Sequence, residues 1–307
     1  MSYFLGIDGG ASKTRCLLGD EYFVVASGVS GPCNPVRVGL EQCEDALLTA
    51  ITQACDAAGI QASHIQSSCL GLAGAARAEI SNPLRDVLRQ IISGHIEIVG
   101  DNQIALHAAL GSDPGVVVIS GTGSIAYGRG SDGRITRAGG WGHAISDEGS
   151  GTWIGRTAIA AIFRAADENQ HEPRLLHEIL RFWNLPTREA LVIKANAPTA
   201  PDFASLVPTI TVVANEGDPL ARSILSRAGS ELAALARIAI TKIFEPATSV
   251  LVAMSGGVFR HCAQVRDSFV HELAVRWPEA TIKSDIADPA FGALDLARRA
   301  AANSDEA

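Results

Sequence analysis

The sequence lacks the features of secreted and membrane proteins. Six cysteines are spread over 307 residues. None of them forms a C-x-x-C pair, so we expect reduced, buried thiols and no disulfide framework. No apolar run approaches the roughly 20 residues of a membrane-spanning helix. The N-terminus shows no charged region followed by the apolar region of a signal peptide. These absences predict a cytoplasmic protein without a membrane partner.

The sequence also lacks a basic block. The formal net charge is -8 at pH 7, which argues against a nucleic-acid partner and against an anionic membrane surface. A small anionic ligand stays compatible with this charge, because it needs only a few local donors. The sequence contains neither the Walker pattern G-x-x-x-x-G-K-[ST] nor a G-x-G-x-x-G turn that opens a helix. Two common ways of holding a nucleotide are therefore excluded.

Apolar residues make up 47% of the chain, enough to build large cores. A length of 307 residues suits two domains better than one. Strand-like and helix-like segments alternate, which is typical of the α/β class. Tyr3–Ile7 and Thr14–Leu18 are expected to form a hairpin, with Tyr22–Ala26 as a third strand. Helices are expected at Leu40–Ala58, which ends before Gly59, and at Pro219–Phe244, which Asp218 would cap. One internal repeat is visible, and its second copy begins just after Asp113-Pro114. The sequence therefore predicts an α/β protein with domains at 1–113 and 114–307.

The repeated unit is an apolar run, a turn of glycines and hydroxyls, and a second apolar run. It reads YFLGIDGGASKTRCLLG in the first copy and GVVVISGTGSIAYG in the second. Glycine lets backbone N–H groups approach phosphate oxygens, and Ser or Thr hydroxyls add donors. One such turn could be an ordinary hairpin turn, but two copies could hold a polyphosphate from both sides. The candidate phosphate-binding residues are Gly9, Gly10, Ser12, Lys13, Gly121, Thr122 and Gly123.

Two aspartates stand beside these patterns. Asp8 lies inside the first turn, where a carboxylate would repel phosphates unless it faced Mg²⁺. Because Mg²⁺ keeps several waters, we expect the contact to run through water; the alternative is an Asx turn. Asp101 follows the strand-like IEIV, where α/β proteins collect active-site residues. Its alternative is an ordinary helix cap.

The stretch AGGWGHAISDEGSGTWIG combines glycines, one tryptophan and two adjacent carboxylates. Carboxylates can accept hydrogen bonds from paired sugar hydroxyls, and an aromatic face can pack on a pyranose ring. The alternative is a capping loop with acidic residues at the start of a helix. In MSGGVFR, Gly256 and Gly257 stand between a strand and a helix. A flat adenine could lie against them, although a tight turn without a ligand explains them nearly as well.

Taken together, these stretches resemble N-acetylglucosamine kinases. GIDGGASKT, VGDNQIAL, VVVISGTGSI, GGWGHAISDEGSG and AMSGGVF occur in the order seen in that family. It belongs to the BadF-type ATPase branch of the sugar kinase, Hsp70 and actin superfamily. The resemblance runs from Phe4 to the final helix and implies two ribonuclease-H-like domains with a cleft between them.

The resemblance also implies a role for each candidate. Asp101 would be the base that deprotonates the 6-hydroxyl of the sugar. The two turns would bind the phosphates of ATP, and Gly256 and Gly257 would border the nucleoside. The implied sugar-site residues are Asn34, Asp101, Ser124, Gly140, Trp141, Gly142 and Asp147. The first turn departs from the family, since it has Ala11 where a third glycine is common.

The expected reaction is 6-phosphorylation of an amino sugar with ATP and Mg²⁺. N-acetylglucosamine leads as the acceptor, because Trp141 offers an apolar wall to an acetyl group, and glucosamine is the close alternative. An ATPase that activates acyl-CoA dehydratases and a sugar-sensing repressor are further alternatives. The cysteines lack obvious cluster spacing for the first, and the second would need an added DNA-binding domain. Assembly into a homodimer is left open.

Overall fold

The computed structural model describes residues 2–168 and 172–305. The chain divides into two compact units, one formed by Met1–Asp113 with Ala287–Ala307 and the other by Pro114–Ile286. The predicted boundary after Asp113 coincides with the first crossing between the units. The assignment of residues 287–307 to the second domain was wrong, because the chain returns to the first unit for its last helix. Within the described residues, no helix is long and apolar enough to cross a membrane.

The first unit is built on a five-stranded sheet with the order β3-β2-β1-β4-β5. Strands β1 and β2 form the predicted antiparallel hairpin, and β4 runs parallel to β1. The third strand begins two residues later than the predicted Tyr22, because Tyr22 and Phe23 lie exposed in the preceding turn. The strands are β1 Tyr3–Gly9, β2 Thr14–Gly19, β3 Val24–Ser30, β4 Ile65–Leu72 and β5 His95–Val99.

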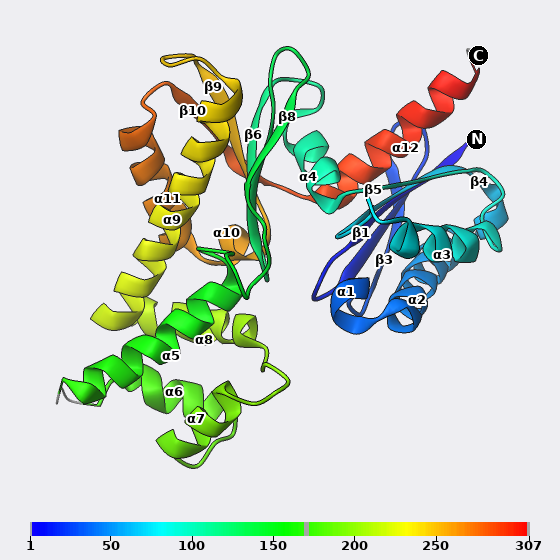
Figure 1. The fold of residues 1–307 in the computed structure, drawn as a ribbon. Helices are drawn as coiled ribbons and strands as arrows, with labels where there is room; N and C mark the ends of the chain where they lie inside the picture. Colours follow the sequence, from blue (N-terminus) through cyan, green and yellow to red (C-terminus); the bar gives the residue numbers. More distant parts are fainter. Residues whose placement is uncertain (1, 169–171, 306–307) are drawn as a thin grey trace. The chain divides into compact units, whose positions relative to one another are not determined.

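Helices cover both faces of this sheet (Figure 1). Side chains alternate along a strand, so Leu5 and Ile7 of β1 join the core beneath α2 and α3, whereas Phe4 joins the core beneath α12. The predicted helix 40–58 is found with those bounds, and it ends before Gly59. The helical segments are α1 Pro35–Val38, α2 Leu40–Ala58, η1 Ala62–His64, α3 Ala78–Arg89, α4 Asp101–Leu110 and α12 Pro289–Asp305.

Close backbone approach explains why α12 belongs to the first unit. A Cβ atom on Gly6 of β1 would lie 2.2 Å from the backbone nitrogen of Leu294 in α12. A Cβ atom on Gly292 of α12 would lie 2.1 Å from the carbonyl oxygen of Ile104 in α4. Helix α12 therefore rests directly on both β1 and α4. Small buried residues of α12, among them Ala290 and Ala293, complete this contact.

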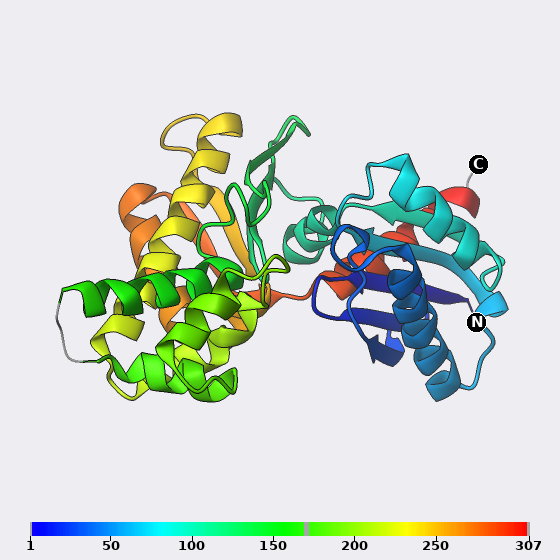
Figure 2. The ribbon, with the colours of Figure 1, turned by 60° about the horizontal axis from the view of Figure 1, so that its bottom comes forward.

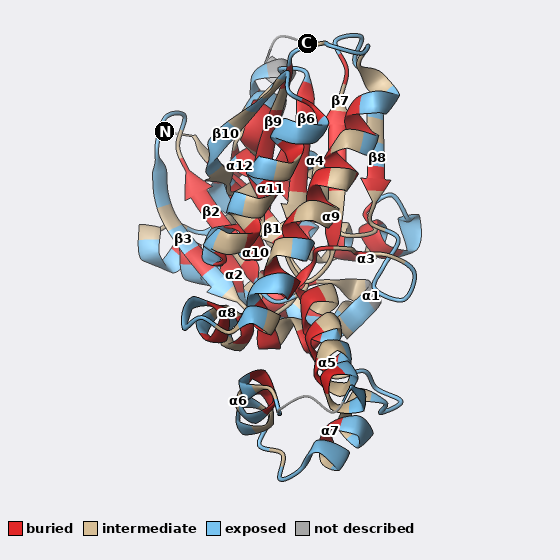
Figure 3. Cartoon of the chain, turned by 90° about the vertical axis from the view of Figure 1, so that its left-hand side faces the viewer, coloured by how far each residue is buried: buried red, intermediate tan, exposed pale blue. Residues whose placement is uncertain are grey.

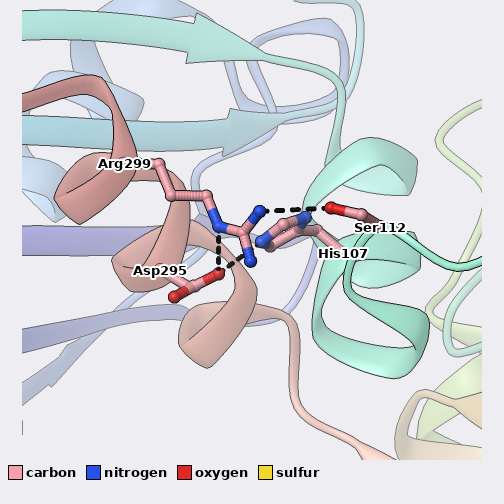
Figure 4. A network of polar contacts seen from close by, with 4 residues as sticks. All are labelled: His107, Ser112, Asp295 and Arg299. Carbon is pink, nitrogen blue, oxygen red and sulfur yellow. Dashed lines mark hydrogen bonds and ion pairs between the residues drawn. The ribbon is translucent and has the colours of Figure 1, made fainter. Parts of the chain in front are cut away.

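Polar contacts join α12 to α4 farther along the helix (Figure 4). The Nε2 atom of His107 lies 2.5 Å from Oδ2 of Asp295, and Nε of Arg299 donates to the same oxygen. Arg299 also donates to Oγ of Ser112, just past the end of α4. His107 is largely buried, and hydrogen bonding to it lowers the pKa of Asp295 against the effect of burial. These contacts fix the orientation of α12 along α4.

The second unit repeats the strand order of the first in a sheet ordered β10-β9-β6-β7-β8. Strands β6, β7 and β8 form an antiparallel meander, and β9 runs parallel to β6. The two units therefore share the ribonuclease-H-like arrangement that the resemblance implies. The strands are β6 Gly115–Ser120, β7 Ser124–Arg129, β8 Ile135–Gly139, β9 Val250–Ser255 and β10 Ala280–Ala287.

Long helices α9 and α11 lie side by side in the second unit (Figures 1 and 2). Asp218 caps α9 as predicted, since its Oδ1 accepts a hydrogen bond of 2.8 Å from the N–H of Ala221. Buried residues line the strands and the inner helix faces, and α6 and α7 combine buried and exposed residues (Figure 3). The helical segments are α5 Gly151–Asp167, α6 Arg174–Phe182, α7 Arg188–Ala195, η2 Phe203–Leu206, α8 Val207–Asn215, α9 Pro219–Ile243, α10 Gly257–His261 and α11 Ala263–Arg276.

The cysteines differ from the expectation at one pair. Cys33 and Cys43 are joined by a disulfide, whereas all six cysteines were expected to be reduced. The loop after β3 folds back on the start of α2 and brings the two residues together, which their spacing of ten residues does not reveal. The other four cysteines are free and buried, as expected.

The packing of α12 yields a stability prediction. Gly292→Ala should lower the melting temperature, because its Cβ atom meets backbone atoms of α4 that cannot move aside. Overpacking of this kind costs roughly 1–3 kcal/mol. Gly31→Ala is the matched control, since nothing lies within 4 Å of its Cβ position. Thermal unfolding of both variants provides the measurement. Equal melting temperatures would contradict the close approach of α12 and α4.

Candidate active site

The first glycine turn links β1 to β2 and presents polar groups at the carboxyl end of β1. The N–H of Gly10 donates to the carbonyl oxygen of Lys13 at 3.0 Å, which closes the turn. A Cβ atom on Gly10 would lie 2.9 Å from that oxygen, so the turn requires glycine there. The side chains of Ser12 and Lys13 are exposed. The turn thus offers a hydroxyl and an ammonium group to a ligand.

Asp8 lies at the end of β1 on the face covered by α12 and α4. Phe4, Gly6 and Asp8 alternate onto this face, and Gly6 touches α12. Burial raises the pKa of Asp8 to about 7, and the negative charges of Asp101 and Asp288 add to this effect. The positive charges of Lys13 and Arg15 oppose it. The carboxyl group of Asp8 therefore sits in a place where its negative charge is poorly compensated.

Asp101 is the first residue of α4, and Gly100 alone separates it from β5. The cap position is Gly100, so Asp101 is not the N-cap of the helix. Its Oδ1 accepts a hydrogen bond of 2.9 Å from the N–H of Asn102. Asp101 is exposed, yet the protein atoms around its carboxyl group displace part of its hydration, and this desolvation raises its pKa. A carboxylate that can be reached and has a raised pKa suits the acceptance of a proton.

Asn34 lies beside the first turn and carries a buried polar atom without a partner. The N–H of its neighbour Cys33 donates to the carbonyl oxygen of Gly10 at 3.0 Å. Oδ1 of Asn34 is buried and has no hydrogen-bond partner among the described residues. Asn34 occupies the cap position of α1, but its side chain makes no capping bond. A buried acceptor without a partner is costly, and a ligand hydroxyl would satisfy it.

Arg15 and Asp288 were missed by the sequence analysis. Arg15 pairs with Asp288, the residue just before α12. No local pattern joins two residues so far apart in the chain. The signal was indirect, since Asp-Pro before a helix marks a helix start and Arg15 sits opposite Asp8 in the predicted hairpin.

The second glycine turn is hydrogen-bonded to the first residues of α5 and to the loop that precedes this helix. The N–H of Gly151 donates to the carbonyl oxygen of Gly121 at 2.8 Å, and the Thr152 hydroxyl donates to that of Thr122 at 2.8 Å. Oγ of Ser124 donates to the carbonyl oxygen of Glu148 at 2.7 Å. The second turn and the acidic loop, predicted as separate parts, therefore form one unit of structure.

Gly256 and Gly257 lie beside the same turn, since β9 is paired with β6 in parallel. Gly256 has a φ of 100°, and a Cβ atom there would lie 2.2 Å from the carbonyl oxygen of Ser120. Only glycine fits this close approach. A Cβ atom on Gly257 or on Gly121 would meet nothing within 4 Å. Open space thus lies beside the backbone of both segments, as a bound nucleotide would require.

Asp147 is buried, and its carboxylate accepts hydrogen bonds from the backbone around it. Its side chain is 7% exposed, and hydrogen bonds from the N–H groups of Ser124 and Gly142 lower its pKa against the larger effect of burial. Its φ of 74° is unusual for a residue other than glycine. The carboxylate joins the second turn to the glycine loop. This geometry gives Asp147 a positioning part that the sequence did not reveal.

Trp141 is accessible and stands between Gly140 and Gly142. Its side chain is 60% exposed, and the guanidinium carbon of Arg137 lies 3.9 Å from the ring centroid. Both neighbouring glycines have positive φ values of 70° and 91°. The stacked Arg137 covers one side of the indole. An open aromatic face held in this way can pack against an apolar sugar face.

A cavity of about 380 Å³ lies next to this loop in the second unit. Its walls are the loop after Gly142 and the first turns of α5. The lining residues include His143, Ser146, Glu148, Trp153 and Arg156. Ser146 donates to Glu148, and Arg156 donates to the carbonyl oxygen of His143 at 3.0 Å. A polar ligand group would find both charge signs here.

The residues fit Mg²⁺ and ATP as ligands. Among the described residues, no group of three or more His, Cys, Asp or Glu side chains could hold a metal ion. Mg²⁺ bound to a nucleotide needs no such cage, because one or two carboxylates, phosphate oxygens and waters suffice. Asp8 supplies a poorly compensated carboxylate beside the first turn. The open backbone at Gly121 and Gly257 suits a nucleotide.

The family model described as the BadF/BadG/BcrA/BcrD ATPase family matches residues 5–297. The chain belongs to this family. It is 34% identical over 302 residues to the N-acetylmuramic acid/N-acetylglucosamine kinase of Clostridium acetobutylicum, covering 97% of this chain and 99% of that protein. It is 27% identical to the N-acetyl-D-glucosamine kinase of Dictyostelium discoideum, covering 96% of this chain and 97% of that protein. The resemblance found in the sequence is thereby confirmed.

A solved structure of similar fold comes from Chromobacterium violaceum, and its name gives N-acetylglucosamine kinase as a provisional assignment. The TM-score is 0.79 at 28% identity, covering 96% of this chain and 99% of that chain. The two-domain α/β fold is therefore that of sugar kinases in the BadF/BadG/BcrA/BcrD ATPase family. ATP use follows from membership of this family.

Burial of Asp8 predicts a pH-dependent stability. The folded state keeps the Asp8 proton up to about pH 7, whereas the unfolded chain releases it near pH 3.8. Wild-type stability should therefore fall as pH rises through this window. Asp8→Asn removes the titration, so its melting temperature minus that of wild type should grow from pH 5 to pH 8 without nucleotide or metal. Asp132→Asn is the control, since hydrogen bonding to the Arg134 N–H lowers the Asp132 pKa. A constant difference for Asp8→Asn would contradict the raised pKa.

Proposed function

We propose that this protein transfers the γ-phosphoryl group of ATP to the 6-hydroxyl of an amino sugar. N-acetylglucosamine is the expected acceptor. The observation that carries this proposal is the repeated glycine–hydroxyl turn, which occupies the same position in two sheets of the same strand order. Full-length similarity to amino sugar kinases supports the acceptor class.

In the first unit, Asp101 is the proposed general base. Its exposed carboxylate follows β5, and its raised pKa favours proton uptake. Asp8 is proposed to face Mg²⁺ through water. When bound, Mg²⁺ neutralises charge on the phosphates of ATP. The first turn donates to phosphate oxygens through the backbone and side chains of Gly9, Gly10, Ser12 and Lys13.

In the second unit, Gly121, Thr122 and Gly123 are proposed to contact the phosphates of ATP. Gly256 and Gly257 border the adenosine, because Gly256 packs closely on the second turn at Ser120 and leaves the backbone of Gly257 open beside it. Phosphoryl transfer asks the protein mainly for positioning and electrostatic stabilisation, and the two turns supply both.

The proposed sugar contacts are of two kinds. One is a buried acceptor atom, and the other is the open glycine loop around Trp141. Oδ1 of Asn34 has no protein partner and would accept a sugar hydroxyl. Trp141 offers its open face, and Asp147 orders the loop through the N–H groups of Ser124 and Gly142. The proposed sugar-binding set is Asn34, Asp101, Ser124, Gly140, Trp141, Gly142 and Asp147.

Different groups on related amino sugars suit different parts of the proposed site. The acetyl group of N-acetylglucosamine suits the apolar wall of Trp141, whereas the ammonium group of glucosamine would suit the acidic loop. The name of the Clostridium relative includes N-acetylmuramic acid, whose carboxylate would need a cation. We propose that the reaction takes place in the cytoplasm, where ATP is available. Assembly into a homodimer is left open.

A coupled ADP-release assay with purified protein tests the proposal. N-acetylglucosamine should give the highest kcat/KM in a panel with glucosamine, N-acetylmannosamine, N-acetylmuramic acid and glucose. ADP release that no sugar stimulates would refute the kinase function. Faster turnover of glucosamine would keep the amino sugar class and reject the preferred acceptor.

Asp101→Asn should remove most turnover and leave the fold intact. Asparagine keeps the shape of the side chain but cannot take the proton, so kcat should fall roughly 10²–10⁴-fold. Calorimetric titration should show ATP and sugar binding close to wild type, and the melting temperature should barely change. Asp113→Asn, at the crossing between the units, is the matched surface control. A near-normal kcat in Asp101→Asn would reject Asp101 as the base.

A further inference from the structure

Asp288 stands where the chain re-enters the first unit. It immediately precedes α12, and its Oδ1 accepts a hydrogen bond of 3.3 Å from the N–H of Ala290. Its other carboxylate oxygen, Oδ2, pairs with the guanidinium group of Arg15. The side chains of Arg15 and Asp288 are both largely buried, at 29% and 16% exposure. This ion pair is better shielded from solvent than most of the others in the described residues.

Arg15 has a second acidic neighbour. Asp8 and Arg15 are directly opposite each other in the β1–β2 hairpin. Side chains of directly opposite residues point to the same face of a sheet, with Cβ atoms about 4.5–5.5 Å apart. The charges of Arg15 and Asp288 both act on Asp8. A flexible arginine so placed can pair with either Asp8 or Asp288, and in this structure it pairs with Asp288.

The position of Asp288 is firmly set. Helix α12 touches the backbone of β1 at Gly6 and that of α4 near Gly292. The contact of His107 with Asp295, together with the hydrogen bond that Arg299 donates to Ser112, holds the helix along α4 (Figure 4). The Arg15 guanidinium also lies 5.9 Å from the ring centroid of Phe291, within the first turn of α12. The start of α12 therefore forms a fixed binding position for the Arg15 side chain.

We propose that Asp288 is a positioning residue, which draws Arg15 away from Asp8 and so keeps the Asp8 carboxylate open to the metal. The proposal rests on the proposed function, in which Asp8 faces Mg²⁺. An arginine that paired with Asp8 would occupy the oxygens that the metal and its waters need. Asp288 prevents this by offering a competing carboxylate at a fixed place.

The charges around Asp8 support this arrangement. The negative charges of Asp101 and Asp288 act on the Asp8 carboxylate, and Arg15 lies directly opposite it in the hairpin. Such a carboxylate would attract a free guanidinium group strongly, since little water screens the pair. Removal of Asp288 would free the one arginine that stands opposite Asp8. The expected consequence is an ion pair between Arg15 and Asp8.

Three variants test the proposal: Asp288→Asn, Arg15→Gln and the double variant. Asparagine can still cap α12 but cannot hold Arg15 by charge. Asp288→Asn should lower kcat by roughly 10–100-fold and raise the Mg²⁺ concentration for half-maximal rate, with the sugar KM unchanged. The double variant should recover most of this loss, because no arginine remains to capture Asp8.

Recovery in the double variant separates this role from a merely structural one. If Asp288 only stabilised the fold, loss of both partners would be no better than loss of Asp288. Arg298→Ala is the control on the same helix, since Arg298 donates to the carbonyl oxygens of Asp20 and Phe23. It should lower the melting temperature without changing the Mg²⁺ dependence.

A measurement without turnover distinguishes this proposal from the proposed function. The shift in melting temperature that ATP causes is recorded against Mg²⁺ concentration for each variant. Asp288→Asn should need more Mg²⁺ for the same shift, and the double variant should return toward wild type. Equal Mg²⁺ dependence in all variants, or a double variant no better than Asp288→Asn, would overturn the role of Asp288. Absence of sugar phosphorylation by wild type would instead count against the proposed function.

Discussion

The first unit depends on one constraint, the placement of the Asp8 carboxylate at the end of β1 among other negative charges. Burial and the charges of Asp101 and Asp288 raise its pKa to about 7, while Lys13 and Arg15 offset part of the effect. Such an arrangement costs stability in the free protein. It is reasonable at a site that binds a cation together with a polyphosphate, because both ligands supply the missing charge balance.

Helix α12 is the element that holds the Asp8 carboxylate in this position. It arrives from the second unit and rests on β1 at Gly6, where a side chain would clash with its backbone. Asp288, the residue just before α12, pairs with Arg15, and the middle of the helix is joined to α4 through His107. One helix thus contacts the strand that carries Asp8 and the helix that begins with Asp101.

Local patterns predicted much of this protein, and long-range pairings escaped them. The β1–β2 hairpin, the helix ending before Gly59 and the Asp218 cap follow from apolar spacing and from turn and cap residues near in sequence. The chain position of α12, the disulfide of Cys33 and the Arg15–Asp288 pair depend on contacts across the fold. The turn at Gly121 and the loop at Asp147 were both found as motifs, but their hydrogen-bonded union appears only in the structure.

The central claim is transfer of a phosphoryl group from ATP to the 6-hydroxyl of an amino sugar. The most direct test is nuclear magnetic resonance of the product formed from ATP and N-acetylglucosamine by the purified protein. The account predicts one new phosphate monoester whose phosphorus couples to the C6 carbon and its two protons. A phosphorus signal coupled to the anomeric carbon, or inorganic phosphate as the sole product, would contradict it.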